Sequence, residues 1–197
     1  MARNDIGRWA SRIAVAGAAL QVVYGVLACA FRYPQISDRP FEALWAIVNV
    51  GMIANLVAWL SLKVARPRPA LVGGGLAILG HLIRIAVSVV IEVRPDSNVD
   101  LPIVVSIVFM FAGLAVLGVA TLRAGRLSGW PSRAPLLVLA AGLIAAPFYT
   151  IDKVVHFILL GLLWGSAWLF MAWTGYRQLD RRTAAEAAAP SVALSEH

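Results

Sequence analysis

Six long apolar segments follow one another along this 197-residue chain. A helix needs about 20 apolar residues to cross a hydrocarbon layer that is roughly 30 Å thick. Segments of this length lie at about residues 10–32, 41–63, 70–92, 102–122, 134–150 and 153–176. The fifth is short and ends at Pro147, so we expect either a kink there or a tight turn into the sixth. The sequence therefore predicts six transmembrane spans.

The composition supports helical spans. Of all residues, 60% are hydrophobic and 14% are charged, whereas soluble domains are about half apolar and one quarter charged. Strands of membrane barrels alternate polar and apolar residues, but these segments are continuously apolar, and their short connections favour antiparallel neighbours. We expect an all-α polytopic membrane protein, a single bundle of six transmembrane helices in three helical hairpins over residues 1–182. The Ala-rich tail, residues 183–197, lacks an apolar face and is expected to be disordered.

Basic residues gather at alternate ends of the spans. Four groups share one predicted side: Arg3, Arg8 and Arg12; Lys63, Arg66 and Arg68; Arg123, Arg126 and Arg133; Arg177, Arg181 and Arg182. The positive-inside rule places this side in the cytoplasm, so we expect a protein of the cell (inner) membrane with both termini cytoplasmic. The net charge of +7 then reflects topology, and the expected partner is the lipid bilayer. Because no continuous basic patch forms, nucleic-acid binding is not expected.

The first span could be mistaken for a cleavable signal peptide, since arginines precede an apolar run that ends in Ala28-Cys29-Ala30. The run is longer than a typical signal core, and its loss would leave an odd number of spans. We therefore expect the first helix to be retained. Cys29 is the only cysteine, so neither an internal disulfide nor a thiol-based metal site can form.

The third span carries the strongest functional signal, because it holds His81 and Arg84 within an apolar sequence. At 100° per residue, its small and polar residues share one narrow face. These residues are Gly74, Ala77, His81, Arg84, Ser88 and Glu92. Counted from Glu92 at the outer boundary, Arg84 lies about 12 Å deep. An arginine facing lipid near the bilayer centre costs at least about 2.5–3.5 kcal/mol, so Arg84 needs a partner.

Polar residues of the first, second and sixth spans can meet this face. If the second, third and sixth helices come together, they form one pocket open to the outer side, with Arg84 and His81 at its floor. The ligand-binding candidates are Arg84, Asn49, Gln21, Tyr24 and Glu92, and the catalytic candidates are Asp152, Glu42, His81 and His156.

Each candidate also has a structural interpretation. Arg84 paired with Asp152 or Glu92 would lock two helices together, because polar residues commonly join membrane helices. A buried histidine such as His81 is most often a hydrogen-bonded core residue. Amides within spans are most often interhelical hydrogen-bonding groups, and acids at helix ends are most often solvated.

Known chemical motifs are absent from the sequence, including HExxH, the Walker loop and the GxSxG elbow. Haem or a metal held between His81 and His156 is disfavoured because the two histidines differ in depth by about 10 Å. No carboxylate has the spacing of a metal site. We expect neither a metal nor a cofactor.

Three classes of function remain. The absence of motifs favours an accessory or structural subunit, whose partner is a larger membrane complex or a homo-oligomer and whose apolar flank is residues 103–120. The first alternative is binding or transport of a small amphiphile whose acidic head pairs with Arg84. The second is a membrane-embedded enzyme acting on a lipophilic substrate, of the cyclase or isomerase type. In that enzyme Asp152 or Glu42 would be the general acid and a histidine the base.

Overall fold

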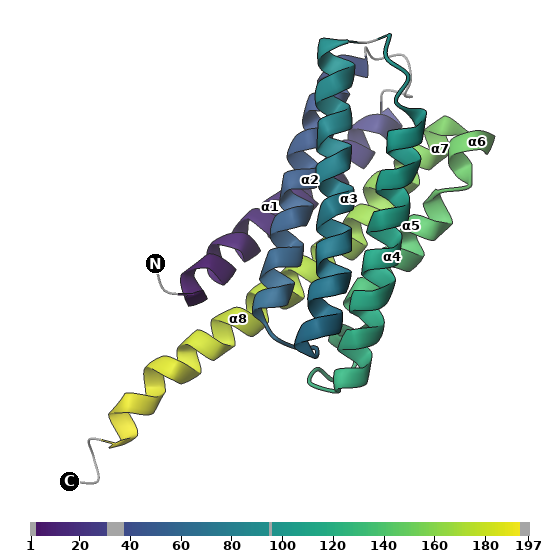
Figure 1. The fold of residues 1–197 in the computed structure, drawn as a ribbon. Helices are drawn as coiled ribbons and strands as arrows, with labels where there is room; N and C mark the ends of the chain where they lie inside the picture. Colours follow the sequence, from purple (N-terminus) through teal and green to yellow (C-terminus); the bar gives the residue numbers. More distant parts are fainter. Residues whose placement is uncertain (1–2, 31–37, 95, 194–197) are drawn as a thin grey trace.

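The computed structural model describes residues 3–30, 38–94 and 96–193, and within them every element is a helix (Figure 1). The long helices are α1 (Arg3–Ala30), α2 (Asp38–Ser61), α3 (Pro67–Val93), α4 (Asp100–Ala124), α5 (Ala134–Ala145) and α8 (Gly165–Ala193). The short elements are η1 (Trp130–Arg133), α6 (Phe148–Ile151), α7 (Lys153–Ile158) and the π-helical segment η2 (Leu159–Trp164). Six helical stretches of the described chain are long and apolar enough to cross a membrane, which confirms the predicted number.

The fifth and sixth of these stretches meet at a sharp break. They cover Trp130–Ile151 and Val154–Ala184, and the residue at the break, Asp152, has an extended backbone with φ −152° and ψ 106°. The break follows Pro147, after which the sequence predicts either a kink or a tight turn. The helices beside the break are short. α5 ends at Ala145, and α6 spans only four residues.

The last helix is longer than its apolar segment. The backbone of α8 is helical to Ala193. Its last part is rich in alanine, which has the highest helix propensity of all residues. The disorder expected from Thr183 onward stays a prediction. Residues 194–197 lie outside the described residues.

The long helices form one bundle in which α2 is central. α2 packs between α1 and α3, α3 packs along α4, and α8 contacts α1, α2 and α5 (Figure 1). The buried side of α2 carries Val48, Met52, Leu56 and Trp59, each no more than 1% exposed. Their spacing of three and four residues keeps them on one helical face. α2 also carries the buried polar residues Asn49 and Asn55, and it contacts α1, α3 and α8.

Two pairs of glycines bring α1 against its neighbours. A Cβ atom on Gly17 would lie 2.5 Å from the Cα atom of Gly51 in α2. A Cβ atom on Gly25 would likewise lie 2.5 Å from the Cα atom of Gly161 in η2. Because small residues let membrane helices approach closely, these contacts fix how near α1 lies to the centre of the bundle.

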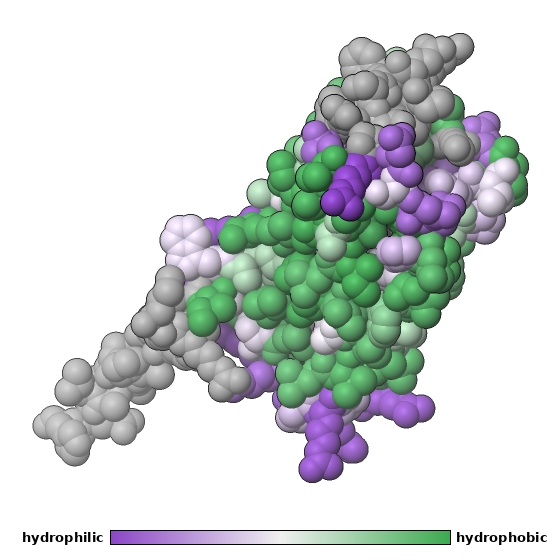
Figure 2. Space-filling model, turned by 45° about the horizontal axis from the view of Figure 1, so that its top comes forward, coloured by the Kyte–Doolittle hydropathy of each residue, from purple (hydrophilic) through white to green (hydrophobic). Residues whose placement is uncertain are grey.

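The surface of the molecule is divided by polarity. Figure 2 shows a broad apolar band around the middle of the bundle, with hydrophilic residues gathered toward its two ends. On α3 and α4, the large apolar side chains of Leu71, Leu82, Val104 and Val108 are more than half exposed. Together with the six apolar helices, this band is typical of a multi-pass membrane protein.

Candidate functional site

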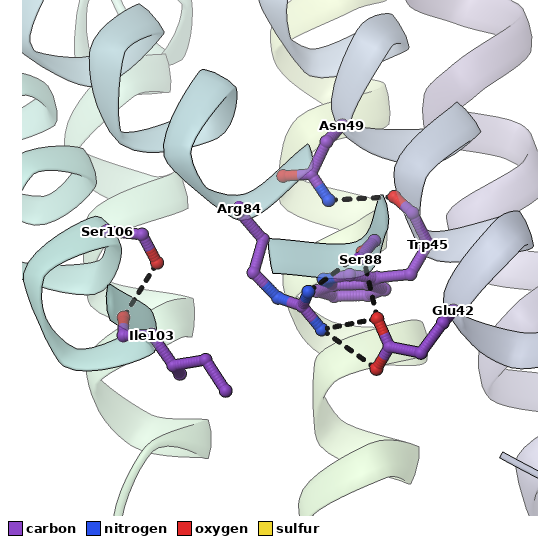
Figure 3. A network of polar contacts seen from close by, with 7 residues as sticks. All are labelled: Glu42, Trp45, Asn49, Arg84, Ser88, Ile103 and Ser106. Carbon is purple, nitrogen blue, oxygen red and sulfur yellow. Dashed lines mark hydrogen bonds and ion pairs between the residues drawn. The ribbon is translucent and has the colours of Figure 1, made fainter. Parts of the chain in front are cut away.

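A closed ion pair joins α2 to α3 (Figure 3). Nη2 of Arg84 donates to both carboxylate oxygens of Glu42, each at 3.1 Å, and Nη1 donates to the hydroxyl of Ser88 at 2.8 Å. The Ser88 hydroxyl in turn donates to Oε2 of Glu42 at 2.8 Å. The three side chains thus form a ring of hydrogen bonds between the two helices.

This ring is largely shielded from solvent. The side chains of Arg84 and Glu42 are 13% and 20% exposed, and Ser88 is buried. The guanidinium carbon lies 5.7 Å from the centre of the Trp45 ring, within the range of a cation–π contact. Arg84 and Ser88 share a face of α3 because they are four residues apart. The guanidinium is therefore enclosed by a carboxylate, a hydroxyl and an indole.

The partner of Arg84 is Glu42, and neither Asp152 nor Glu92 pairs with it. Glu92 is exposed. Asp152 is also exposed, and its Oδ1 accepts hydrogen bonds from the backbone N–H groups of Val154 and Val155 at 2.9 and 3.1 Å. Asp152 is thus the N-cap of α7, a position that carboxylates favour, and the interpretation in which it locks α3 to the sixth span is wrong.

His81 lies one turn from Arg84 on α3 and contacts α2. Its Nδ1 is 2.7 Å from Oδ1 of Asn49. Nδ2 of Asn49 donates to the Trp45 carbonyl at 2.8 Å, and because a carbonyl only accepts, the amide must turn its oxygen toward the imidazole. Nδ1 of His81 is therefore the donor. In the neutral ring this leaves Nε2 as a hydrogen-bond acceptor.

Aromatic rings from four elements gather beside His81. The Trp168 ring lies edge-on to the imidazole at 5.5 Å between centroids, and Trp164 lies 6.0 Å from Trp168. Trp45 lies 6.3 Å from Trp164, and Tyr24 lies 5.5 Å from Trp45. We refer to Tyr24, Trp45, His81, Trp164 and Trp168 as the aromatic cluster. It joins α1, α2, α3, η2 and α8 at the centre of the bundle.

Polar atoms of the aromatic cluster lack partners. Within the described part of the chain, Nε2 of His81 and Nε1 of Trp45, Trp164 and Trp168 are buried without any hydrogen bond. Leaving a buried donor or acceptor unsatisfied costs about 1–3 kcal/mol, and nearly all such groups in folded proteins have partners. Three indole donors and one imidazole acceptor therefore belong to one series of ring contacts and lack a hydrogen-bond partner among the described residues.

Two amides beside the cluster show the same pattern. Gln21 donates from Nε2 to the carbonyl of Leu160 at 2.9 Å, and Asn55 donates from Nδ2 to the carbonyl of Trp168 at 3.0 Å. The amide oxygens of Gln21 and Asn55 are buried and have no partner among the described residues. Gln21 thus holds α1 to the π-helical segment. π-Helical turns occur frequently at functional sites.

His156 lies in a separate network. Its Nδ1 is 2.9 Å from the carbonyl oxygen of Ala145, and its ring is 5.3 Å from Tyr149 and 5.2 Å from Phe157, between centroids. It therefore ties α7 to the end of α5. The structure brings together Glu42, Asn49, His81 and Arg84 as expected from their faces, and it places Asp152 and His156 elsewhere.

The tryptophans of the cluster are the residues that the sequence interpretation missed. No functional role was predicted from the sequence for Trp45, Trp164 or Trp168. Trp45 and Asn49 are four residues apart, as are Trp164 and Trp168. This spacing was the available signal, because residues four apart lie on one helical face. It places Trp45 beside Asn49, and Trp164 beside Trp168.

No family model, no curated protein and no solved structure matches this chain. In the portion of the chain that the structure describes, no group of three or more His, Cys, Asp or Glu side chains could hold a metal ion.

Proposed function

We propose that this protein binds a small amphiphile with a neutral, hydrogen-bonding head group at the aromatic cluster. The observation that carries the proposal is the set of buried, unpartnered polar atoms: Nε2 of His81 and the three indole nitrogens of Trp45, Trp164 and Trp168. A head group with both a hydroxyl and a carbonyl would donate to the imidazole and accept from the indoles. Aromatic faces would pack against its apolar part.

The charge of the site favours a neutral head group over an acidic one. The guanidinium of Arg84 already donates to Glu42 and Ser88, so an acidic ligand would have to displace a carboxylate. The unpartnered atoms of the aromatic cluster carry no formal charge when the imidazole is neutral. The Glu42–Arg84 pair then acts as a closure between α2 and α3, beside the binding site.

Catalysis is supported less well than binding. The carboxylate of Glu42 already accepts bonds from Arg84 and Ser88, and Asp152 caps α7. A general acid must lie within hydrogen-bond reach of the group that it protonates. Neither carboxylate shares a hydrogen bond with the imidazole of His81 or His156, so the side chains of the acid and base candidates do not form pairs.

Conservative replacement of His81 tests the binding proposal. His81→Asn keeps a donor near the position of Nδ1 but removes Nε2, whereas His81→Gln keeps a polar group near Nε2. One lost hydrogen bond of about 1–3 kcal/mol corresponds to about 5- to 150-fold weaker binding. We expect native mass spectrometry of protein extracted in mild detergent to show a small-molecule adduct that His81→Asn loses and His81→Gln partly retains.

The matched control is His156→Asn, which alters a buried histidine outside the aromatic cluster and should leave the adduct unchanged. Absence of any adduct from the wild-type protein, or equal loss in both Asn variants, would contradict binding. Water would then complete the hydrogen bonds of the cluster. An accessory role within a larger membrane complex or a homo-oligomer would be the better conclusion.

We also propose that the chain lies in the cell membrane with both termini in the cytoplasm, as the distribution of arginine and lysine indicates. Cys29 offers a direct test because it is exposed at the end of α1. A membrane-impermeant maleimide should label Cys29 on intact cells. In a Cys29→Ser background, Ser128→Cys, at an exposed position after α4, should be labelled only after permeabilisation. The opposite pattern would reverse the orientation.

A further inference from the structure

A hollow with a volume of about 540 Å³ lies between the start of α3 and the end of α4. Its lining residues are Arg66, Pro69, Ala115, Val116, Val119, Ala120, Arg123 and Ala124. The volume falls within the range of about 300–1,000 Å³ that is usual for small-molecule pockets. The hollow lies at the end of the bundle opposite the Glu42–Arg84 pair, so it is distinct from the aromatic cluster.

The hollow is charged at one end and apolar at the other. From Ala115 to Arg123 it follows α4 for about 12 Å, at 1.5 Å per residue. Toward the middle of α4 its lining consists of alanine and valine residues, and toward the end of the bundle it is lined by Arg66 and Arg123. This gradient runs along the helix axis. It matches an amphiphile with its head at the membrane boundary and its chain in the hydrocarbon.

The local packing explains why the hollow is open. A Cβ atom on Gly73 would lie 2.5 Å from the backbone nitrogen of Leu117, so α3 and α4 are in backbone contact at that level. Pro69 and Arg66 precede Gly73 by one to two turns, at the start of α3. The small side chains of Ala120 and Ala124 face this part of α3 across the hollow and leave its space unfilled.

The electrostatics of the rim favour an anion. Arg66 and Arg123 are exposed, and within the described residues neither is paired with a carboxylate or bonded through its side chain. Arg126 adds positive charge at the same end, where its Nη1 donates to the Lys63 carbonyl at 2.5 Å. α3 also begins here without a side-chain cap, so its dipole contributes further positive potential.

We propose that this hollow binds an anionic phospholipid, with the phosphate between Arg66 and Arg123 and one acyl chain against the alanine and valine wall. Basic pockets between membrane helices recognise lipid head groups in this manner. The apolar wall sets this occupant apart from free phosphate, which would use the arginines alone. The proposal requires the chain to lie in a membrane and is independent of the amphiphile at the aromatic cluster.

Lipid retention after reconstitution tests this proposal. Wild-type protein and the variant Arg66→Gln/Arg123→Gln would be placed in nanodiscs of phosphatidylcholine with a minor fraction of phosphatidylglycerol. Bound lipid would then be measured by native mass spectrometry after release. At about 1 kcal/mol for each arginine–phosphate contact, we expect retention of phosphatidylglycerol to fall about 30-fold. Retention of phosphatidylcholine should not change.

Two further variants distinguish lipid binding in the hollow from a general effect of surface charge. Arg68→Gln removes one positive charge from an exposed residue outside the hollow. Because Arg68 would not contact the phosphate and salt screens exposed charges, retention should stay within about twofold. Ala115→Leu narrows the apolar wall without changing any charge and should also reduce retention. Equal losses for Arg68→Gln and for the double variant would overturn the proposal. So would unchanged retention in Ala115→Leu, or displacement of the lipid by inorganic phosphate alone.

Discussion

Replacing Glu42 by alanine is expected to lower the free energy of unfolding by about 3–5 kcal/mol, because it leaves a largely buried guanidinium without its counter-charge. Arg84 would lose two of its three hydrogen bonds, and Ser88 would lose its acceptor. The change in unfolding free energy can be measured by titration with sodium dodecyl sulfate in mixed micelles. The fluorescence of the buried tryptophans reports the transition.

A double replacement separates the charge effect from the loss of packing. When both members of a buried ion pair become apolar, stability is often unchanged or improved. Glu42→Leu/Arg84→Leu should therefore be markedly more stable than Glu42→Ala. Glu92→Ala, which removes an exposed glutamate from α3, should change stability by less than about 0.5 kcal/mol. A Glu42→Ala protein as stable as Glu92→Ala would show that Arg84 finds water or another partner.

The features that could be predicted from the sequence are those that each helix determines by itself. The six predicted spans follow from the length of the apolar segments. At each of these six segments the structure has a helical stretch long enough to cross a membrane. The inward polar face of α3 follows from a period of 3.6 residues. Gly74, Ala77, His81 and Ser88 on that face are all buried. The need of Arg84 for a partner follows from the cost of a charge in hydrocarbon.

The features that could not be predicted depend on which helices meet and at what height. From the sequence, Asp152 or Glu92 was expected to pair with Arg84, whereas the packing of α2 against α3 places Glu42 there. The π-helical segment η2 contacts α1 closely through Gly25 and Gly161, and this contact between distant segments has no signal in the sequence of either one. The aromatic cluster combines residues from five elements, so spacing along any one helix reveals only part of it.

The contact between α1 and η2 links the fold to the proposed binding site. Gln21 lies one turn before Gly25, and its Nε2 reaches the Leu160 carbonyl at 2.9 Å only because the two backbones touch. The same contact holds Tyr24 against Trp45 and Phe157. A small displacement of α1 would therefore separate the aromatic cluster from its wall on α1, even though no residue of the cluster was replaced.

Gly25→Ala provides this displacement and is expected to lower the free energy of unfolding by about 3 kcal/mol, at the upper end of the range for overpacked sites. The new Cβ would lie 2.5 Å from the Cα atom and 2.7 Å from the carbonyl carbon of Gly161, and 2.8 Å from the backbone nitrogen of Leu162. These are backbone atoms, so no rotation of a side chain can relieve the clash. The same micelle titration measures the loss.

The control for Gly25→Ala is Gly75→Ala, because a Cβ on Gly75 would meet no atom within 4 Å. Both replacements gain up to about 1 kcal/mol of helix propensity, so Gly75→Ala should be neutral or slightly stabilising, and the difference between the two variants isolates the contact with η2. Gly25→Ala should also lose the small-molecule adduct, since moving α1 breaks the Gln21–Leu160 bond. Loss of stability with full retention of the adduct would mean that the binding site does not depend on α1.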